Sequence, residues 1–155
     1  MAIRNAAKAM VIQSGKILVN RYSSANGEIY YDLPGGGQLQ FETMEEAVQR
    51  EVLEETGYHV KIKRFIALAE EIYEDSQIRE QYYDYSHRIL HIFLAELTSE
   101  QRIPPSETDF NQEDSIWLSF DEADKITFRP KQLSGCISQL IFSNSPQYLG
   151  YVHIP

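Results

Sequence analysis

The sequence has little cysteine, little positive charge and no long apolar run, and each shortage excludes a class of protein. Cys136 is the single cysteine, so a disulfide framework or a thiolate metal cluster cannot form within one chain. Lys and Arg total 14 against 23 Asp and Glu, which gives a net charge of −9. This acidic balance argues against a nucleic-acid duplex or an anionic membrane surface as the main partner.

The N-terminal region also lacks the features of a targeting or membrane segment. The apolar stretch that follows Arg4 and Lys8 is too short for a signal-peptide core or a membrane span. With one cysteine as well, we expect a protein of the reducing cytoplasm. The 155 residues, 43% of them hydrophobic, predict one domain over residues 1–155 with a single core. A homodimer is left open.

The most informative segment runs from residue 36 to residue 57. Its characteristic residues are Gly36, Glu42, Arg50, Glu51, Val52, Glu54, Glu55 and Gly57. At average residue usage, the seven other than Val52 would occur together by chance on the order of 10⁻⁹ times per starting position. The spacing therefore points to a specific function.

Local signals predict a helix over most of this segment. Thr43 followed by Glu46 forms a capping box, so the helix should begin directly after Thr43. It should end at Gly57, because glycine tolerates the left-handed conformation just past a helix C-terminus. Val48 and Val52 lie one turn apart and predict a buried stripe.

Three glutamates project from one side of this predicted helix. Glu51, Glu54 and Glu55 repel one another at i,i+3 and i,i+4 spacing, and they face the negative end of the helix dipole. A divalent cation would remove both penalties, and a hard cation such as Mg²⁺ prefers oxygen ligands. The alternative is a solvated acidic face, which leaves the other fixed positions unexplained. Arg50 is placed to pair with Glu54 one turn on and with Glu46 one turn back.

At these residues the sequence resembles the Nudix hydrolase family. The family signature is Gly, five residues, Glu, seven residues, Arg-Glu, an aliphatic residue, any residue, Glu-Glu, any residue, Gly, then an aliphatic residue. The match is complete from Gly36 to Gly57, and Tyr58 departs from it at a packing position. The preceding residues 31–37, YDLPGGG, are also similar to the family's entry into the motif.

The resemblance implies a metal-dependent hydrolase of a nucleoside diphosphate linked to another group X. Glu51, Glu54 and Glu55 would hold Mg²⁺, or Mn²⁺ in its place, together with a backbone carbonyl of Gly35 or Gly36. Arg50 and Glu42 would orient the ligating carboxylates. The rival interpretation is a Nudix-like domain that binds a nucleotide and signals without turnover. Its usual mark is the loss of a metal carboxylate, and none is lost here.

Several roles stay open at this point. Glu51, Glu54 and Glu113 are all eligible to accept the proton of the attacking water, and we favour the motif pair. Arg21 is either a phosphate contact or a surface arginine. Tyr31 and Tyr73 either stack on a base or pack against the sheet.

The pattern elsewhere predicts strands and one closing helix. Strands are expected over residues 6–13, 17–20, 60–73, 89–97 and 115–118, with a turn at Ser14 and Gly15. A helix is expected over residues 131–142, from the spacing of its apolar residues. This order predicts an α/β fold with a mixed sheet and helices on both faces, which is the α/β/α sandwich that the resemblance also implies.

Overall fold

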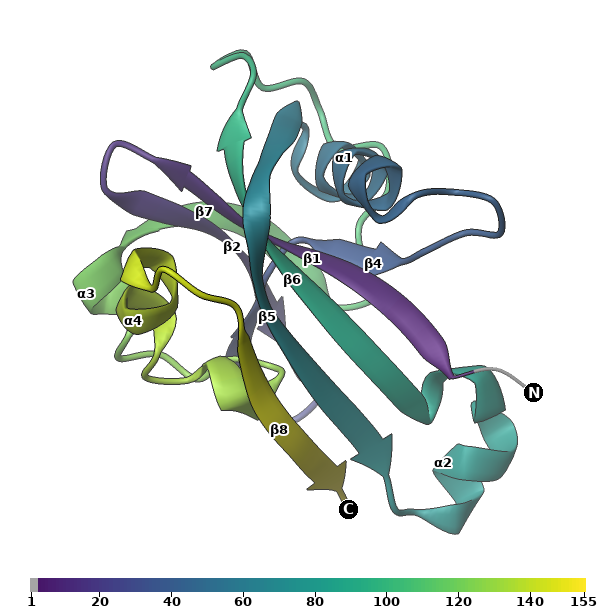
Figure 1. Ribbon diagram of the computed structural model, residues 1–155. Helices are drawn as coiled ribbons and strands as arrows, with labels where there is room; N and C mark the ends of the chain where they lie inside the picture. Colours follow the sequence, from purple (N-terminus) through teal and green to yellow (C-terminus); the bar gives the residue numbers. More distant parts are fainter. Residues whose placement is uncertain (1–2) are drawn as a thin grey trace.

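An eight-stranded mixed sheet forms the centre of the molecule in the computed structural model, which describes residues 3–155 (Figure 1). The strands are β1 (Arg4–Gln13), β2 (Lys16–Ser23), β3 (Ile29–Asp32), β4 (Gly35–Gly37), β5 (Val60–Tyr73), β6 (His87–Leu97), β7 (Gln112–Ser119) and β8 (Gln147–Ile154). The helices are α1 (Met44–Thr56), α2 (Ser76–Gln81), α3 (Phe120–Ala123) and α4 (Ile137–Phe142), with 3₁₀ turns η1 (Tyr83–Tyr85) and η2 (Lys131–Leu133). The mixed α/β class predicted from the sequence is confirmed.

The sheet opens between its two N-terminal strands. The strand order is β3-β2-β1-β6-β5-β8, with β4 paired to β1 and β7 paired to β2. Strands β1 and β2 pair only next to their hairpin, at Ile12 with Ile17 and Gln13 with Lys16. Farther along β1, the three glycines of β4 take the place of β2 as its neighbour. This divergence places β4 beside α1 (Figure 1).

Two apolar clusters, one on each face, hold the helices against the sheet. Alternate residues of β1 and β2 face α1, where Ala9, Val11 and Leu18 pack with Val48 and Val52. The opposite face packs against α3, η2 and α4, and its largest buried residues include Met10, Ile17, Phe128, Leu133, Ile137 and Leu140. The period-two alternation of the strands therefore supplies both cores. Figure 1 shows α1 on one side of the sheet and α3 and α4 on the other.

The signature helix has the bounds that its capping residues predict. Thr43 accepts from the backbone N–H of Glu46, and the Glu46 carboxylate accepts from the N–H of Thr43. Gly57 ends the helix in the left-handed conformation, with φ of 77°. The predicted turn at Ser14 and Gly15 is also present, with positive φ at both residues.

The predicted helix over residues 131–142 is wrong. The segment forms η2, breaks at Gly135, whose φ is 79°, and resumes as α4. The apolar spacing matched one helix because both pieces send their apolar side chains into the same core. The described part of the chain contains no helix that is long and apolar enough to cross a membrane.

Candidate active site

Arg50 is the centre of a charge network on the exposed side of α1. Its Nε donates to Oε1 of Glu42 at 2.7 Å, and one terminal nitrogen donates to Glu51 at 2.8 Å and to Glu54 at 3.2 Å. The other terminal nitrogen donates to the carbonyl of Gly37 at 3.0 Å. The hydrogen bond from Arg50 lowers the pKa of Glu42. Arg50 thus connects the helix to both ends of the β4–α1 loop.

One detail of this network differs from the sequence expectation. Arg50 pairs with Glu54, as expected, but the carboxylate of Glu46 is held by Thr43 in the capping box. Glu42, which lies on the loop before the helix, takes the place predicted for Glu46. Glu46 does not reach Arg50 because the capping box holds its carboxylate against the backbone of Thr43.

Glu55 points inward from α1 and fixes the glycine strand. The residue is only 3% exposed, and its carboxylate accepts from Nδ2 of Asn20 at 2.8 Å and from the N–H of Gly35 at 3.0 Å. Burial raises the pKa of Glu55 to about 8. A nearby cation favours the charged form of a carboxylate, so a cation in this site would lower the pKa of Glu55.

Lys8 completes the support beneath Gly35. Its buried ammonium donates to Asp32 at 2.7 Å, to the carbonyl of Leu33 at 3.1 Å and to the carbonyl of Gly35 at 2.8 Å. The Gly35 carbonyl is therefore already engaged. Gly36 lies against Glu51, where an added Cβ would stand 2.5 Å from Oε2 of that glutamate. Glycine is needed at position 36 for this close approach.

An acidic cavity of about 80 Å³ lies at the C-terminal end of α1. It is lined by Glu51, Glu54, Glu55, Glu107, Thr108 and Asp109. Within residues 3–155, no three His, Cys, Asp or Glu side chains converge as a ready-formed metal site. Glu51 and Glu54 turn toward Arg50 here, and Glu55 turns toward Asn20. The donor set is nonetheless all oxygen and rich in carboxylates, which fits a hard divalent cation.

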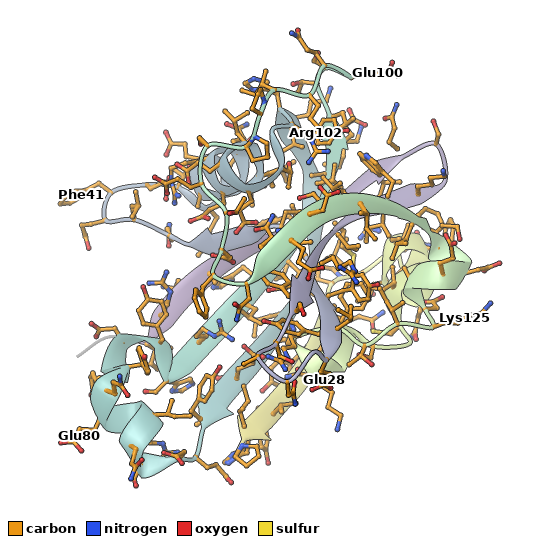
Figure 2. The ribbon with its side chains drawn as sticks, turned by 180° about the vertical axis from the view of Figure 1, so that it is seen from behind. Glu28, Phe41, Glu80, Glu100, Arg102 and Lys125 are labelled. Atoms are coloured by element: carbon orange, nitrogen blue, oxygen red, sulfur yellow. The ribbon has the colours of Figure 1, made fainter. Side chains whose placement is uncertain are left out.

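The loop that supplies Glu107 and Asp109 is attached to the end of α1. The backbone N–H groups of Ser106 and Glu107 donate to the carbonyl of Glu54 at 2.9 and 3.1 Å. Arg102 donates to the carbonyl of Thr56 at 2.8 Å. Figure 2 shows this segment passing alongside α1 from Glu100 and Arg102. The loop satisfies carbonyls that a helix end leaves free, and so brings two more carboxylates to the cavity.

Sequence reasoning missed Glu107 and Asp109. Both lie in an acidic, proline-containing stretch that resembles an ordinary surface loop. Their approach to α1 depends on tertiary hydrogen bonds, which no local pattern reveals. The acidic character of the stretch was the only available signal.

A second cavity, of about 540 Å³, borders the acidic one, and Asp109 lines both. Its walls are mostly aromatic, with two arginines and two aspartates. The lining residues are Tyr22, Tyr30, Asp32, Tyr73, Ile78, Tyr82, Tyr85, Arg88, Asp109, Phe110 and Arg129. Tyr22 donates its hydroxyl to Asp109 at 3.1 Å. A ligand that spans both cavities would meet carboxylates at one end and aromatic rings at the other.

The structure separates the residues predicted to bind substrate. Tyr73 lines the aromatic cavity. Arg21 forms an ion pair with Glu113 between β2 and β7, and both side chains are more than a third exposed. Tyr31 is half-buried and packs against the core on the α4 side. Arg21, Tyr31 and Glu113 are not among the residues that line either cavity.

A larger hollow of about 800 Å³ lies on the outer side of α1. Figure 2 shows Phe41 at the tip of the loop that forms one wall of this hollow. The hollow contains Glu42 and Arg50 but none of the three motif carboxylates Glu51, Glu54 and Glu55. We therefore assign the candidate site to the two smaller, adjoining cavities.

Solved structures of other proteins share this fold. A NUDIX hydrolase from Nitrosomonas europaea is 18% identical with a TM-score of 0.70, over 99% of this chain and 80% of that one. A MutT protein from Bacillus halodurans is 19% identical with a TM-score of 0.67, over 98% and 91%. An ADP-ribose pyrophosphatase from Streptococcus suis is 20% identical with a TM-score of 0.60, over 97% and 100%. At these identities the likeness concerns the fold.

The family follows from the sequence match. The family model described as the NUDIX domain matches residues 2–135, which include α1, the glycine strand and the loop that carries Glu107 and Asp109. Because this match covers most of the 155 residues, the chain belongs to the NUDIX domain family and is a Nudix hydrolase.

Proposed function

We propose that this Nudix hydrolase cleaves a pyrophosphate bond in a nucleoside diphosphate linked to another group X. The candidates for the substrate are a nucleoside triphosphate, a dinucleoside polyphosphate and a nucleotide sugar. The observation that carries the proposal is the junction of an acidic cavity with an aromatic one at Asp109. We further propose that residues 1–155 act as one domain and that the enzyme works in the cytoplasm.

Nudix hydrolases generally use divalent metal ions, and the acidic cavity suits one. Glu51, Glu54 and Glu55 would hold Mg²⁺ or Mn²⁺ together with a backbone carbonyl of Gly35, which also accepts from Lys8, or of Gly36. When bound, the cation would neutralise phosphate charge and lower the pKa of water. A bound cation would also offset the unfavourable interaction between these carboxylates and the negative end of the helix dipole.

The chain's own residues would orient the reacting groups. Arg50 holds Glu51 and Glu54 at fixed positions and is itself fixed by Glu42 and Gly37. One carboxylate of the cavity would accept the proton of the water that attacks phosphorus. Glu51 and Glu54 remain the favoured proton acceptors. Glu107 is a better further candidate than Glu113, because Glu107 lines the cavity and Glu113 pairs with Arg21.

The aromatic cavity would hold the nucleoside. Tyr73 lies in its wall, which supports the predicted contact between this ring and the base. A substrate bound in this way places its pyrophosphate toward Asp109 and the motif glutamates. The names of the similar structures differ in substrate, as a MutT protein and an ADP-ribose pyrophosphatase illustrate, so X must be found by experiment.

A substrate panel tests this proposal. The purified chain is incubated with nucleoside triphosphates, dinucleoside polyphosphates and nucleotide sugars in Mg²⁺ or Mn²⁺, and products are resolved by ³¹P NMR. We expect release of a nucleoside monophosphate from at least one class. Nucleotide binding without any product in either metal would contradict the proposal and favour a sensor.

A further inference from the structure

Three side chains in the aromatic cavity form a continuous stack. The rings of Tyr22 and Tyr30 lie 5.0 Å apart between centroids, with planes 7° from parallel. The guanidinium carbon of Arg129 lies 3.7 Å from the centroid of Tyr30, which is the separation of stacked planes. All three residues line the cavity. The stack runs from the buried Tyr22 to the exposed Arg129.

Hydrogen bonds at both ends hold the stack in place. The N–H of Arg129 donates to the carbonyl of Tyr31 at 2.8 Å, and the N–H of Tyr31 donates to the carbonyl of Thr127 at 3.1 Å. These bonds fasten the Arg129 backbone to β3, which also carries Tyr30. At the other end, the Tyr22 hydroxyl is bound to Asp109. These contacts fix the backbone that carries Arg129 beside β3 and hold the ring of Tyr22 before a ligand arrives.

The side chain of Arg129 has one protein partner among the described residues, the ring of Tyr30. No ion pair or side-chain hydrogen bond to Arg129 is formed within residues 3–155. The other arginine of the cavity, Arg88, is by contrast paired with Glu71. One face of the Arg129 guanidinium covers Tyr30, and the group remains exposed at the cavity. A planar cation in this position can accept a second planar group on its open face.

The surroundings favour a neutral planar ligand over an anion. Asp109 lines the cavity and would repel a phosphate that no cation screens, whereas the charge of Asp32 is paired with Lys8. Most other lining side chains are aromatic, and their ring faces offer a surface for stacking rather than positive charge. A nucleobase suits both conditions, since it is uncharged and flat.

We propose that the Tyr22–Tyr30–Arg129 stack is the platform for the substrate's base, with the Arg129 guanidinium lying between Tyr30 and the base. This inference rests on the proposed nucleotide substrate and adds the residue that selects for a base. Arg129 is thus a specificity-determining residue. The phosphates then extend toward Asp109 and the acidic cavity.

The test uses neutral nucleosides, so that no phosphate contact contributes. Dissociation constants of adenosine, guanosine, cytidine and uridine are measured by ligand-observed NMR in EDTA. The variants are Arg129→Lys, which keeps the charge but loses the planar group, and Arg129→Gln, which loses the charge. Arg64→Lys is the matched control, because Arg64 lies outside the cavity and donates to the carbonyl of Ile141 at 2.9 Å. Melting temperatures confirm that each variant is folded.

We expect both Arg129 variants to bind the preferred nucleoside roughly fivefold to a hundredfold more weakly, the range for loss of one stacking partner. Arg64→Lys should bind like the parent. Parental affinity in Arg129→Lys would overturn the inference, as would failure of the parent to bind any of the four nucleosides. Substrate turnover distinguishes the two proposals. If the parent hydrolyses substrate but Arg129→Lys binds nucleosides as the parent does, only the platform is refuted. If nucleoside binding depends on Arg129 but the parent hydrolyses no substrate, only the proposed hydrolysis is refuted.

Discussion

Replacement of Lys8 by Met should destabilise the protein strongly, because it leaves a buried charge unpaired. The side chains of Lys8 and Asp32 are 7% and 19% exposed, and their charged atoms lie 2.7 Å apart. Burial lowers the pKa of Lys8, but the charges of Asp32 and Glu55 outweigh burial and raise it, so Lys8 is charged at neutral pH. The variant also removes the donor to the carbonyls of Leu33 and Gly35.

We expect Lys8→Met to lower the free energy of unfolding by about 3–5 kcal/mol, as for other buried pairs that lose one partner. This is a large part of the roughly 5–15 kcal/mol that stabilises a typical domain. Adding Asp32→Asn should recover at least about 1 kcal/mol, because the neutral amide no longer leaves a buried charge. Urea unfolding followed by fluorescence of Trp117 measures both changes.

An exposed lysine gives the matched control. Lys61 pairs with Glu96 at 3.0 Å, but its side chain is 56% exposed. Lys61→Met should therefore change the free energy of unfolding by less than about 1 kcal/mol. If Lys8→Met falls within 1 kcal/mol of the parent, or if Asp32→Asn brings no recovery, the buried pair does not support the glycine strand as argued.

Three further predictions concern the helix, the base contact and the proton acceptor. Thr43→Ala should cost about 1 kcal/mol and lower the melting temperature while activity at low temperature survives, and an unchanged melting temperature would refute the cap's role. Tyr73→Ala should weaken nucleotide binding by roughly 1–3 kcal/mol and raise KM far more than it lowers kcat. A loss of stability with constant KM would instead make Tyr73 a packing residue. Glu107→Gln should slow turnover more than Glu113→Gln, since only Glu107 lines the acidic cavity, and equal rates would remove Glu107 from the mechanism.

Local signals made the signature helix predictable from the sequence. Thr43 and Glu46 bond to one another within one turn, and Gly57 ends the helix through its own backbone conformation. The strand over residues 60–73 was predictable for a similar reason, since a long extended apolar run needs no distant partner to be identified. The i,i+4 spacing also predicted the pairing of Arg50 with Glu54, but not its contacts with Glu42 and Glu51.

Features that depend on distant partners were not predictable. Strand β8 pairs in parallel with β5, about 80 residues earlier, and its mixed sequence gives no clear alternation. The break at Gly135 reflects packing of two short pieces into one core. Glu107 reaches the site through hydrogen bonds to Glu54, and Arg129 reaches Tyr30 because its backbone bonds to Tyr31. The positions of the residues proposed to bind the nucleoside therefore depend mostly on tertiary contacts.

The most direct test of the proposed chemistry compares Glu54→Gln with Glu45→Gln on the best substrate of the panel. Both changes remove one charge from α1 without changing shape, but only Glu54 lines the acidic cavity, and Glu45 is exposed in the first turn. Rates of nucleoside monophosphate release are measured across a Mg²⁺ titration and in excess EDTA. The account predicts that Glu54→Gln loses several orders of magnitude in kcat, that Glu45→Gln keeps the parental rate, and that EDTA abolishes turnover. Full activity in EDTA, or a Glu54→Gln enzyme as fast as the parent, would contradict it.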